Sequence, residues 1–465
     1  MEEKKGINIS VKSFITAIVI IFALMVMTYG LTFVVPSGEF ARIADANGDM
    51  IIDTSVGFRY VDGGIPFWKW LLSPIMVLGA EGNVTLIAVI VFLLVIGGVF
   101  NSLDRSGLMK YMLDKIVKKF GRARYKLMAM IILFFMSLGS FIGSFEECVP
   151  LVPIVVALSV SLGWDTLTGV GISVLAAGCG FAAGVCNPFT VGVAQELAGL
   201  PMFSGMGYRM VGFVLIYSLL LFLIRSYAKR IEKPLTDEAV GAEFVQNKKM
   251  DKGLVCFAGI LGAGVLLVLS SVFFKAIQDY TMIIVAVMFL VAGIVSTVVC
   301  GMSGREIGGS FWGGITSVFP AVLMILMASS IKYTLEEAKI LDTILSSAMG
   351  IAETLPKWVV ILFIYLLVLG MNFFTSSGSA KAFLLMPLIV PMAQVFGISP
   401  QLCVMAYAFG DGFSNVFYPT NPVLLISLGL ADVSYAKWVK WTWKFQLLNL
   451  LMTSGLLLLG LVIGY

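Results

Sequence analysis

The chain is dominated by long apolar runs, each close to the roughly 20 residues that a helix needs to cross a bilayer. These runs predict transmembrane helices at about 13–36, 84–103, 205–227, 254–274, 281–300, 313–333 and 441–464. Two further regions, about 127–200 and 358–431, are also apolar but are interrupted by Gly, Pro, Asn and Ser. Each region is too long for two spans and too interrupted for uniform helices, so we expect broken helices there.

The predicted fold class is an all-α polytopic membrane protein with five units. They are an N-terminal helix with an outer loop and an interfacial helix (1–81), a first repeat (82–228), a cytoplasmic linker (229–253), two transmembrane helices (254–310) and a second repeat (311–465). We expect residues 37–64 to form the outer loop. Residues 66–78 suit an interfacial helix, because their tryptophans can lie at the depth of the headgroups. The run that begins at Ser13 is too long for the apolar core of a cleavable signal peptide.

The two broken regions resemble each other in sequence order. Pro153 aligns with Pro387, and Asn187-Pro188 aligns with Asn421-Pro422, both at an offset of 234. Upstream, residues 101–113 fall on residues 333–345 at an offset of 232. This match predicts an internal duplication. Each copy would hold a transmembrane helix, an interfacial helix, a helical hairpin, a discontinuous helix and a final transmembrane helix.

The positions of lysine and arginine predict that the two copies are inverted. Eight basic residues lie between Arg105 and Lys126, and most of the 31 fall on that side if the N-terminus is cytoplasmic and the C-terminus outside. The matching segment from Lys332 to Lys357 has a small acidic excess and suits the outside. The hairpins would then be re-entrant from opposite sides. Inverted repeats with broken helices are typical of secondary transporters, which bind their substrate near the membrane midplane.

The repeated Asn-Pro dipeptide predicts where each discontinuous helix starts again. Asn is a favoured N-cap and Pro is favoured at the first helical position, so a helix should begin at Pro188 and another at Pro422. Unwound backbone is expected around Gly180–Asn187 and Ser414–Asn421. The free N–H groups of such helix ends form a natural site for a carboxylate. The alternative is a pair of ordinary helix kinks.

Charged residues at bilayer depth are costly, and several stand in the broken regions. Glu146 and Glu147 lie at the first hairpin tip, Lys381 follows the second tip, and Asp411 precedes the second break. Glu147 falls on Lys381 at the offset of 234, so a mutual ion pair is one interpretation. Alternatively, Lys381 holds a substrate carboxylate or replaces a bound cation, while a glutamate holds an ammonium group, Na⁺ or a proton. Asp411 falls on Ala177, so the duplicated scaffold does not require its charge.

The candidate site residues gather at the two tips and the two breaks. The candidates for substrate binding are Ser144, Glu146, Glu147, Asn187, Pro188, Thr190, Ser376, Ser377, Gly378, Ser379, Lys381, Asn415, Thr420 and Asn421. The candidates for ion coupling are Ser144, Glu147, Gly184, Ser377, Asp411 and Ser414, and backbone carbonyls of the same loops could bind Na⁺.

Composition excludes several other functions. Apolar residues make up 59% of the chain and charged residues 12%, and there is no histidine for a Ser-His-Asp triad or a His-ligated metal. The six cysteines lie in apolar stretches without a CxxC motif. A Gly-Lys dipeptide is absent, which excludes a Walker A loop and ATP-driven pumping, and the net charge of +4 gives no sign of nucleic-acid binding. An intramembrane enzyme is disfavoured, because Asp411 lacks the GxGD motif of aspartyl proteases and no motif supports a Ser379–Lys381 dyad.

Five strings carry a resemblance to a known family. They are FEECVPLVP (145–153), NPFTVGVAQELAGLPMFSGMGYR (187–209), NFFTSSGSAKA (372–382), FGDGFSN (409–415) and YAKWVKW (435–441). With them the chain resembles the YfcC family, a branch of the C4-dicarboxylate anaerobic carrier-like (DcuC-like) group in the ion transporter superfamily. The resemblance covers most of the chain and is strongest over 139–215 and 370–442.

The resemblance implies a homodimer of scaffold and transport domains that works by an elevator mechanism. It implies that substrate and coupling ion bind at Ser144–Glu147, Gly184–Thr190, Ser376–Lys381 and Ser414–Asn421. Relatives carry C4-dicarboxylates, and this branch is commonly assigned to basic amino acid antiport.

We therefore expect a secondary transporter in a bacterial cytoplasmic membrane, not an enzyme. It would move a small carboxylate-bearing solute, either an amino acid or a C4-dicarboxylate. No cofactor is expected, and Na⁺, H⁺ or a counter-solute would provide the coupling. The alternative is a Na⁺/H⁺ antiporter without an organic substrate, in which Glu147 and Asp411 exchange the ions.

Overall fold

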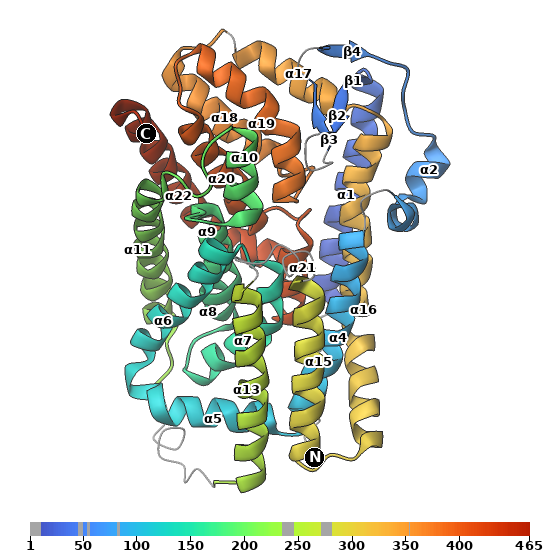
Figure 1. Cartoon of the computed structure of the whole chain (residues 1–465). Coiled ribbons are helices and arrows are strands. Elements are labelled where there is room, and N and C mark those ends of the chain that lie inside the picture. The colour runs from blue at the N-terminus through green and yellow to red at the C-terminus, as the bar shows by residue number, and fades with distance from the viewer. Residues whose placement is uncertain are drawn as a thin grey trace.

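The computed structural model describes residues 11–44, 50–53, 56–80, 84–234, 246–270, 281–352 and 354–465. Regular structure in these residues is mostly helical, and most of the long helices run roughly parallel to one another (Figure 1). The predicted cytoplasmic lysines Lys4 and Lys5, and residues 235–245 of the predicted linker, lie outside the described residues.

Seven helices among the described residues are long and apolar enough to cross a membrane. They are Leu86–Arg105, Arg124–Ile142, Thr166–Leu197, Met206–Ile231, Gly304–Glu337, Gly378–Val395 and Tyr435–Ile463. Shorter apolar helices are Ile18–Val34, Ile283–Val299, Leu341–Ala352 and Lys357–Met371. The chain is therefore a multi-pass membrane protein, as its apolar runs predicted.

Long helices form at the predicted spans outside the broken regions. They are α1 (Val11–Val34), α4 (Val84–Arg105), α11 (Met206–Ile231), α13 (Lys248–Ser270), α15 (Thr281–Val299), α16 (Gly304–Glu337) and α22 (Tyr435–Ile463). α16 begins well before its apolar run because Ser303 and Glu306 form a capping box, in which each side chain accepts a hydrogen bond from the other residue's backbone N–H. The last residues of the span predicted at 254–274 lie outside the described part.

The first broken region is a series of short helical segments. They are α6 (Arg124–Ser137), η3 (Leu138–Ile142), η4 (Glu146–Leu151), α7 (Val152–Ser161), α8 (Thr166–Val170), η5 (Gly171–Leu175), α9 (Ala176–Ala183), η6 (Pro188–Gly192) and α10 (Val193–Leu197), and α5 (Leu108–Phe120) and η2 (Gly121–Ala123) precede them. The second consists of α18 (Lys357–Met371), α19 (Gly378–Val395), α20 (Pro400–Asn415) and α21 (Pro422–Leu430), and α17 (Leu341–Ala352) precedes it. α5 and α17 lie at opposite ends of the molecule (Figure 1).

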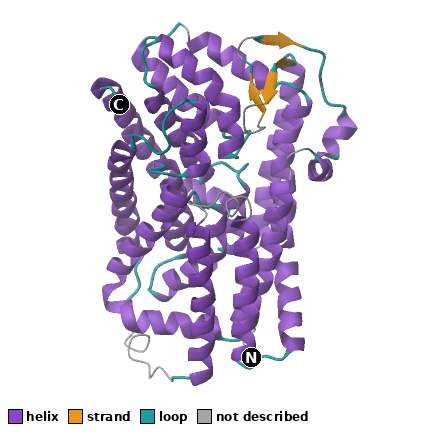
Figure 2. Ribbon diagram, viewed as in Figure 1, coloured by secondary structure: helices purple, strands orange, loops and turns teal. Residues whose placement is uncertain are grey.

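The expectation of a loop at 37–64 is wrong, because this segment contains four short strands, while the rest of the described chain is mostly helical. Strand β1 (Gly38–Phe40) pairs with β4 (Phe58–Tyr60), and β2 (Arg42–Ala44) pairs with β3 (Met50–Ile52), all antiparallel (Figure 2). Strands of three residues are too short to leave an alternating pattern in the sequence. Tertiary contacts hold them, since the N–H of Phe40 donates to Oδ2 of Asp342 on α17 at 2.9 Å.

The segment at 66–78 is helical as predicted, but in three short pieces: α2 (Phe67–Leu71), α3 (Ser73–Met76) and η1 (Val77–Gly79). Trp68 is exposed, whereas Trp70 is buried. The indole N–H of Trp70 donates to the carbonyl of Met25 at 3.2 Å, and its ring stacks on Tyr29 with centroids 4.7 Å apart. One tryptophan therefore fixes this segment to α1.

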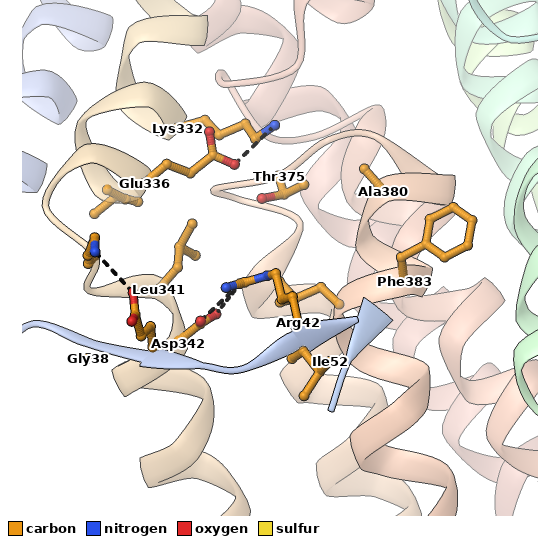
Figure 3. A pocket seen from close by; sticks show the side chains of 14 residues that line it. Gly38, Arg42, Ile52, Lys332, Glu336, Leu341, Asp342, Thr375, Ala380 and Phe383 are labelled. Carbon is orange, nitrogen blue, oxygen red and sulfur yellow. Dashed lines mark hydrogen bonds and ion pairs between the residues drawn. The ribbon is translucent and has the colours of Figure 1, made fainter. Parts of the chain in front are cut away.

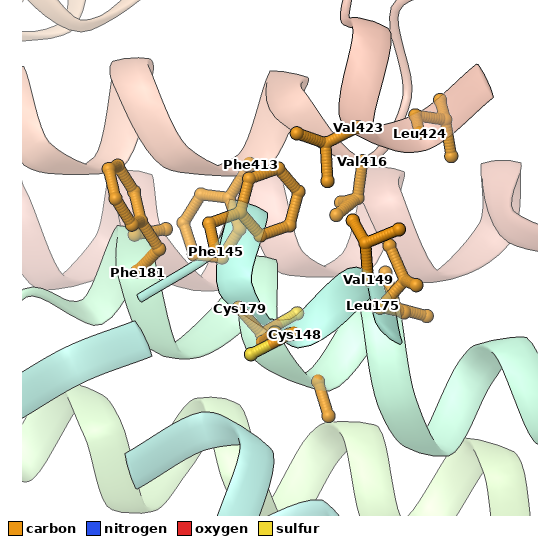
Figure 4. Packing of buried hydrophobic residues seen from close by; sticks show 14 of the residues in the cluster. Phe145, Cys148, Val149, Leu175, Cys179, Phe181, Phe413, Val416, Val423 and Leu424 are labelled. Atoms are coloured by element: carbon orange, nitrogen blue, oxygen red, sulfur yellow. The ribbon is translucent and has the colours of Figure 1, made fainter. Parts of the chain in front are cut away.

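The two broken regions pack directly against each other. α9 contacts α20, α10 contacts α19, and α21 contacts the long helix α16, which also packs on α1 and α4. Figure 4 shows the apolar side chains at this junction, where Phe145, Cys179 and Phe181 face Phe413 and Val416. This packing buries most of both breaks, whereas the second tip stays partly exposed at Ser377.

Candidate functional site

The first discontinuous helix breaks between Ala183 and Pro188. α9 ends at Ala183, three residues beyond the start of the predicted unwinding at Gly180, and η6 restarts at Pro188. The side-chain oxygen of Asn187 accepts the N–H of Phe189 at 2.9 Å, so Asn187 is the N-cap that the dipeptide predicted. Its other amide atom, Nδ2, is buried without a hydrogen-bond partner among the described residues.

The first tip is tied to this break. Ser140 on η3 accepts the N–H of Val185 with its hydroxyl at 3.0 Å and the N–H of Cys186 with its carbonyl at 3.1 Å. Gly143 follows with φ +79°, and a Cβ there would lie 2.3 Å from Oδ1 of Asn187. Only glycine fits that close approach in a left-handed conformation. The tip therefore lies directly against the N-cap.

Arg209 on α11 also holds the first break, and the sequence analysis overlooked it. Its side chain is fully buried. Nε and Nη2 both donate to the carbonyl of Val185, at 3.2 and 3.1 Å, and Nη1 donates to the hydroxyl of Tyr465 at 3.1 Å. A charged residue inside an apolar span is a signal that could have identified it.

The second break repeats the asparagine N-cap of the first, and the second tip has a serine cap that η4 at the first tip lacks. The chain leaves the helical conformation after α18, and Ser377 caps α19 by accepting the N–H of Ala380 at 3.5 Å. α20 ends at Asn415, and α21 begins at Pro422. Asn421 caps it by accepting the N–H of Val423 at 2.9 Å, so the second predicted restart is also present.

Lys381 and Asp411 form an ion pair in the interior. Lys381 Nζ lies 2.6 Å from Oδ1 of Asp411, and both side chains are 0% exposed. Nζ also donates to the carbonyl of Thr375 at 3.0 Å and to Oδ1 of Asn372. The interpretation in which Lys381 pairs with Glu147 is wrong, because Lys381 is one helical turn into α19 and points toward α20, whereas Glu147 lies in η4 beside α13 and α15.

Asn372 connects the ion pair to the second break, and it too escaped the sequence analysis. Its Nδ2 lies 2.9 Å from the Asp411 carbonyl, 2.6 Å from the Ser414 hydroxyl and 2.9 Å from Oδ1 of Asn415. The amide of Asn421 donates to the same Asn415 oxygen at 2.9 Å. The sequence signal that could have identified Asn372 is an Asn in an apolar context just before the second tip.

The two halves meet at Gly378, the first residue of α19. A Cβ on Gly378 would lie 2.7 Å from Cγ2 of Thr190 on η6 and 2.9 Å from Oδ2 of Asp411 on α20. Thr190 Oγ1 and Asp411 Oδ2, which belong to the two residues that make these contacts, are buried without a hydrogen-bond partner among the described residues. The same holds for Asn187 Nδ2 in the first break and Thr420 Oγ1 in the second, so each of these atoms could hydrogen-bond a small polar ligand.

The other predicted residues differ in burial. Glu146 and Glu147 are half-buried, as are Pro188, Ser376 and Ser379, while Ser377 is exposed and Ser144 and Gly184 are buried. Glu147 and Ser144 line a small apolar cavity of about 60 Å³ between the first tip and helices α13 and α15, and Oε2 of Glu147 has no hydrogen-bond partner among the described residues.

A larger cavity of about 390 Å³ lies outside the second tip, between the outer strands, α16, α17 and α19 (Figure 3). Charged pairs line it: Arg42 with Asp342 at 2.9 Å, Lys339 with Glu39 at 3.0 Å and Lys332 with Glu336 at 3.2 Å. Thr375 and Ala380 also line it, so it reaches the tip that carries Lys381.

Comparison with known proteins identifies the family. The family model for the C4-dicarboxylate anaerobic carrier, DcuC, matches residues 14–462. The chain is 32% identical over 405 residues to the Escherichia coli (strain K12) protein named "Putative basic amino acid antiporter YfcC", covering 82% of this chain and 79% of that protein. It is 24% identical over 513 residues to an uncharacterized protein of Haemophilus influenzae (strain ATCC 51907 / DSM 11121 / KW20 / Rd), covering 98% and 97%.

Two solved structures are similar over most of their length. The YdaH transporter of Alcanivorax borkumensis has a TM-score of 0.46 at 20% identity, with 97% of this chain and 98% of that chain covered. MtrF of Neisseria gonorrhoeae has a TM-score of 0.47 at 15% identity, with 96% and 95% covered. Both TM-scores lie below 0.5, too low to establish a shared helix arrangement. The family match and the YfcC relative are sufficient by themselves: the chain belongs to the C4-dicarboxylate anaerobic carrier family and is a YfcC/DcuC-like transporter.

Proposed function

We propose that the chain is a secondary active transporter that moves a small carboxylate-bearing solute across the cytoplasmic membrane of a bacterium. The solute is an amino acid, with basic amino acids included, or a C4-dicarboxylate. Na⁺ or H⁺ symport or solute exchange drives it. The N-terminus lies in the cytoplasm and the C-terminus outside, and the working unit is a homodimer.

One observation carries this proposal: at both breaks, beside the helix restarts, buried hydrogen-bonding atoms have no partner among the described residues. Asn187 Nδ2 is an N–H donor, and the hydroxyls of Thr190 and Thr420 can each donate. The N-terminal ends of the helices that start at Pro188 and Pro422 add positive dipole ends. A carboxylate would satisfy these donors, whose burial without a partner is otherwise unfavourable.

Inverted repeats and elevator-type alternating access are part of the same proposal. The matched offsets of the Asn-Pro dipeptides and the placement of α5 and α17 at opposite ends of the molecule support the inversion. A rigid movement of the tips and breaks past α1, α4 and α16 would carry the solute.

Uptake by the purified chain in proteoliposomes tests the function. Radiolabelled amino acids and C4-dicarboxylates are compared under Na⁺, pH and counter-solute gradients, with wild type against Asn187→Ala. We expect uptake of one solute class by wild type and a loss of at least about tenfold in the variant, which corresponds to about 1.4 kcal/mol of binding free energy.

Asn101→Ala is the matched control. Asn101 donates to the carbonyl of Ser310 at 2.6 Å between α4 and α16, so this variant also loses a hydrogen bond of an asparagine, but away from the tips. Wild-type uptake by Asn187→Ala, or an equal loss in both variants, would refute the site assignment.

A Na⁺/H⁺ antiporter is the second candidate, and Glu147 favours it, because its Oε2 adjoins an apolar cavity and finds no hydrogen-bond partner in the described part of the chain. The pairing of Asp411 with Lys381 counts against Asp411 as the second exchanging group. Ion exchange in proteoliposomes without any organic solute, abolished in Glu147→Gln, would favour this function over the first.

A further inference from the structure

Three oxygen atoms of different chemical kinds surround the ammonium group of Lys381. Asp411 contributes a carboxylate oxygen, Asn372 an amide oxygen and Thr375 a backbone carbonyl. An ammonium group has three N–H donors and no acceptor, so three oxygens saturate it. Its charge and hydrogen-bonding capacity are therefore fully used inside the protein.

The amide orientation of Asn372 is fixed by its surroundings. Three acceptors face Nδ2: the carbonyl of Asp411, the hydroxyl of Ser414 and the side-chain oxygen of Asn415. Reversing the amide would place its oxygen against them and its N–H₂ group against the ammonium, which is unfavourable on both sides. Oδ1 is thus held toward Lys381 whether or not the lysine is there.

Carboxylate, amide and backbone carbonyl oxygens are the ligands that alkali cations prefer in proteins. The carbonyl of Thr375 comes from the non-helical stretch between α18 and α19, and Asn372 ends α18. Non-helical backbone at the ends of interrupted helices is where transporters bind coupling cations. Asp411 contributes the one negative charge that a monovalent cation needs.

The same oxygens connect the second tip to the rest of the molecule. Asp411 belongs to α20, while Lys381 and Thr375 lie on either side of Gly378, whose carbonyl accepts the hydroxyl of Tyr407 on α20. A positive charge between these elements therefore holds the tip against α20.

We propose that the Lys381 ammonium occupies a monovalent cation site formed by Asp411, Asn372 and the Thr375 carbonyl, so that the chain supplies this cation from its own sequence. The proposal goes beyond the proposed function, since it concerns the cation and not the solute. Wild type should then bind no alkali cation from solution at this site, and shortening Lys381 should create a site that binds free Na⁺.

Thermal unfolding of the purified full-length chain in detergent tests this. Wild type and Lys381→Ala are compared in NaCl, KCl, LiCl and choline chloride at equal ionic strength, without any organic solute. For wild type we expect no difference in Tm among the four salts beyond any that Lys381→Met also shows. For Lys381→Ala we expect a lower Tm in choline chloride and a saturable rise with an alkali cation, growing with the logarithm of its concentration above the dissociation constant.

Two controls locate the response. Lys381→Met fills the space of the lysine stem without a charge, so its Tm should not respond to the cation. Lys381→Ala combined with Asp411→Asn removes the negative charge and should also abolish the response. If Lys381→Ala cannot be purified, Lys381→Asn is measured in the same way, because its amide keeps a hydrogen-bonding partner for Asp411.

The proposal is overturned by a saturable Na⁺-dependent rise in the Tm of wild type that Asp411→Asn abolishes, since the site would then be open to free cation. It is also overturned if the folded variant, Lys381→Ala or Lys381→Asn, shows the same Tm in every salt. Neither result depends on which solute is transported, so failure of the proposed function would leave this test intact.

Discussion

Gly378→Ala tests the closeness of the two halves at the second tip. The added methyl would lie 2.7 Å from Cγ2 of Thr190 and 2.9 Å from Oδ2 of Asp411, well inside the roughly 3.5–4.0 Å of a favourable contact. Overpacking of this kind costs about 1–3 kcal/mol. Helix propensity alone would favour alanine over glycine by up to about 1 kcal/mol. The two effects have opposite signs, so the sign of the change identifies which one dominates.

We expect Gly378→Ala to lower the free energy of unfolding, measured by denaturation of the purified chain in mixed micelles. Thr190→Ser removes the methyl group Cγ2, so the double variant should recover part of the loss, while the contact with Asp411 keeps the rest. Gly370→Ala is the matched control, because a Cβ on Gly370 in α18 meets no atom within 4 Å. Gly378→Ala that is as stable as wild type, or an identical loss with and without Thr190→Ser, would refute the close packing.

Three further predictions concern charges. Asp411→Ala leaves Lys381 buried without a counter-charge, which should lower the free energy of unfolding by about 3–5 kcal/mol. The double variant Asp411→Ala with Lys381→Met should regain most of that loss. Additive losses in a double-mutant cycle would contradict the coupling of the two residues. Hydrogen bonds from Lys339 and then Arg59 lower the pKa of Glu39 on the outer strand β1. The carboxylate of Glu39 therefore stabilises the fold fully above its ordinary pKa, and this contribution disappears as the pH falls through the lowered pKa. The Tm difference between wild type and Glu39→Gln should shrink as the pH falls through this range, and also at high salt. Arg209→Lys keeps the charge but loses the fork that holds the first break, so its Tm should fall, and an unchanged Tm would argue that charge alone matters there.

The sequence was a good guide where the signal is local. The transmembrane spans follow from runs of apolar residues, and the restarts at Pro188 and Pro422 follow from a dipeptide whose two residues suit adjacent positions at a helix start. Both breaks were predicted too long on their N-terminal side. The helix continues through Gly180 to Ala183, and through Ser414 to Asn415, since tertiary packing supports small and polar residues inside buried helices.

Prediction failed where the signal depends on packing between distant elements. The three-residue strands of the outer segment exist because their backbone pairs with one another and with Asp342, which lies 302 residues from Phe40 along the chain. Such short strands have no periodicity of their own. Tertiary contacts also placed Trp70 against α1, which its residue type alone does not predict.

The sequence by itself determined that this chain is a multi-pass membrane protein and where its helices break, because apolar length and capping chemistry act within one segment. Only the tertiary structure decided that Lys381 meets Asp411 and not Glu147, and that Asn372 and Arg209 hold the two breaks. Those choices depend on how α18, α19 and α20 are rotated and packed against one another. No spacing along the chain encodes that rotation, which follows from the burial of the whole set of helices at once.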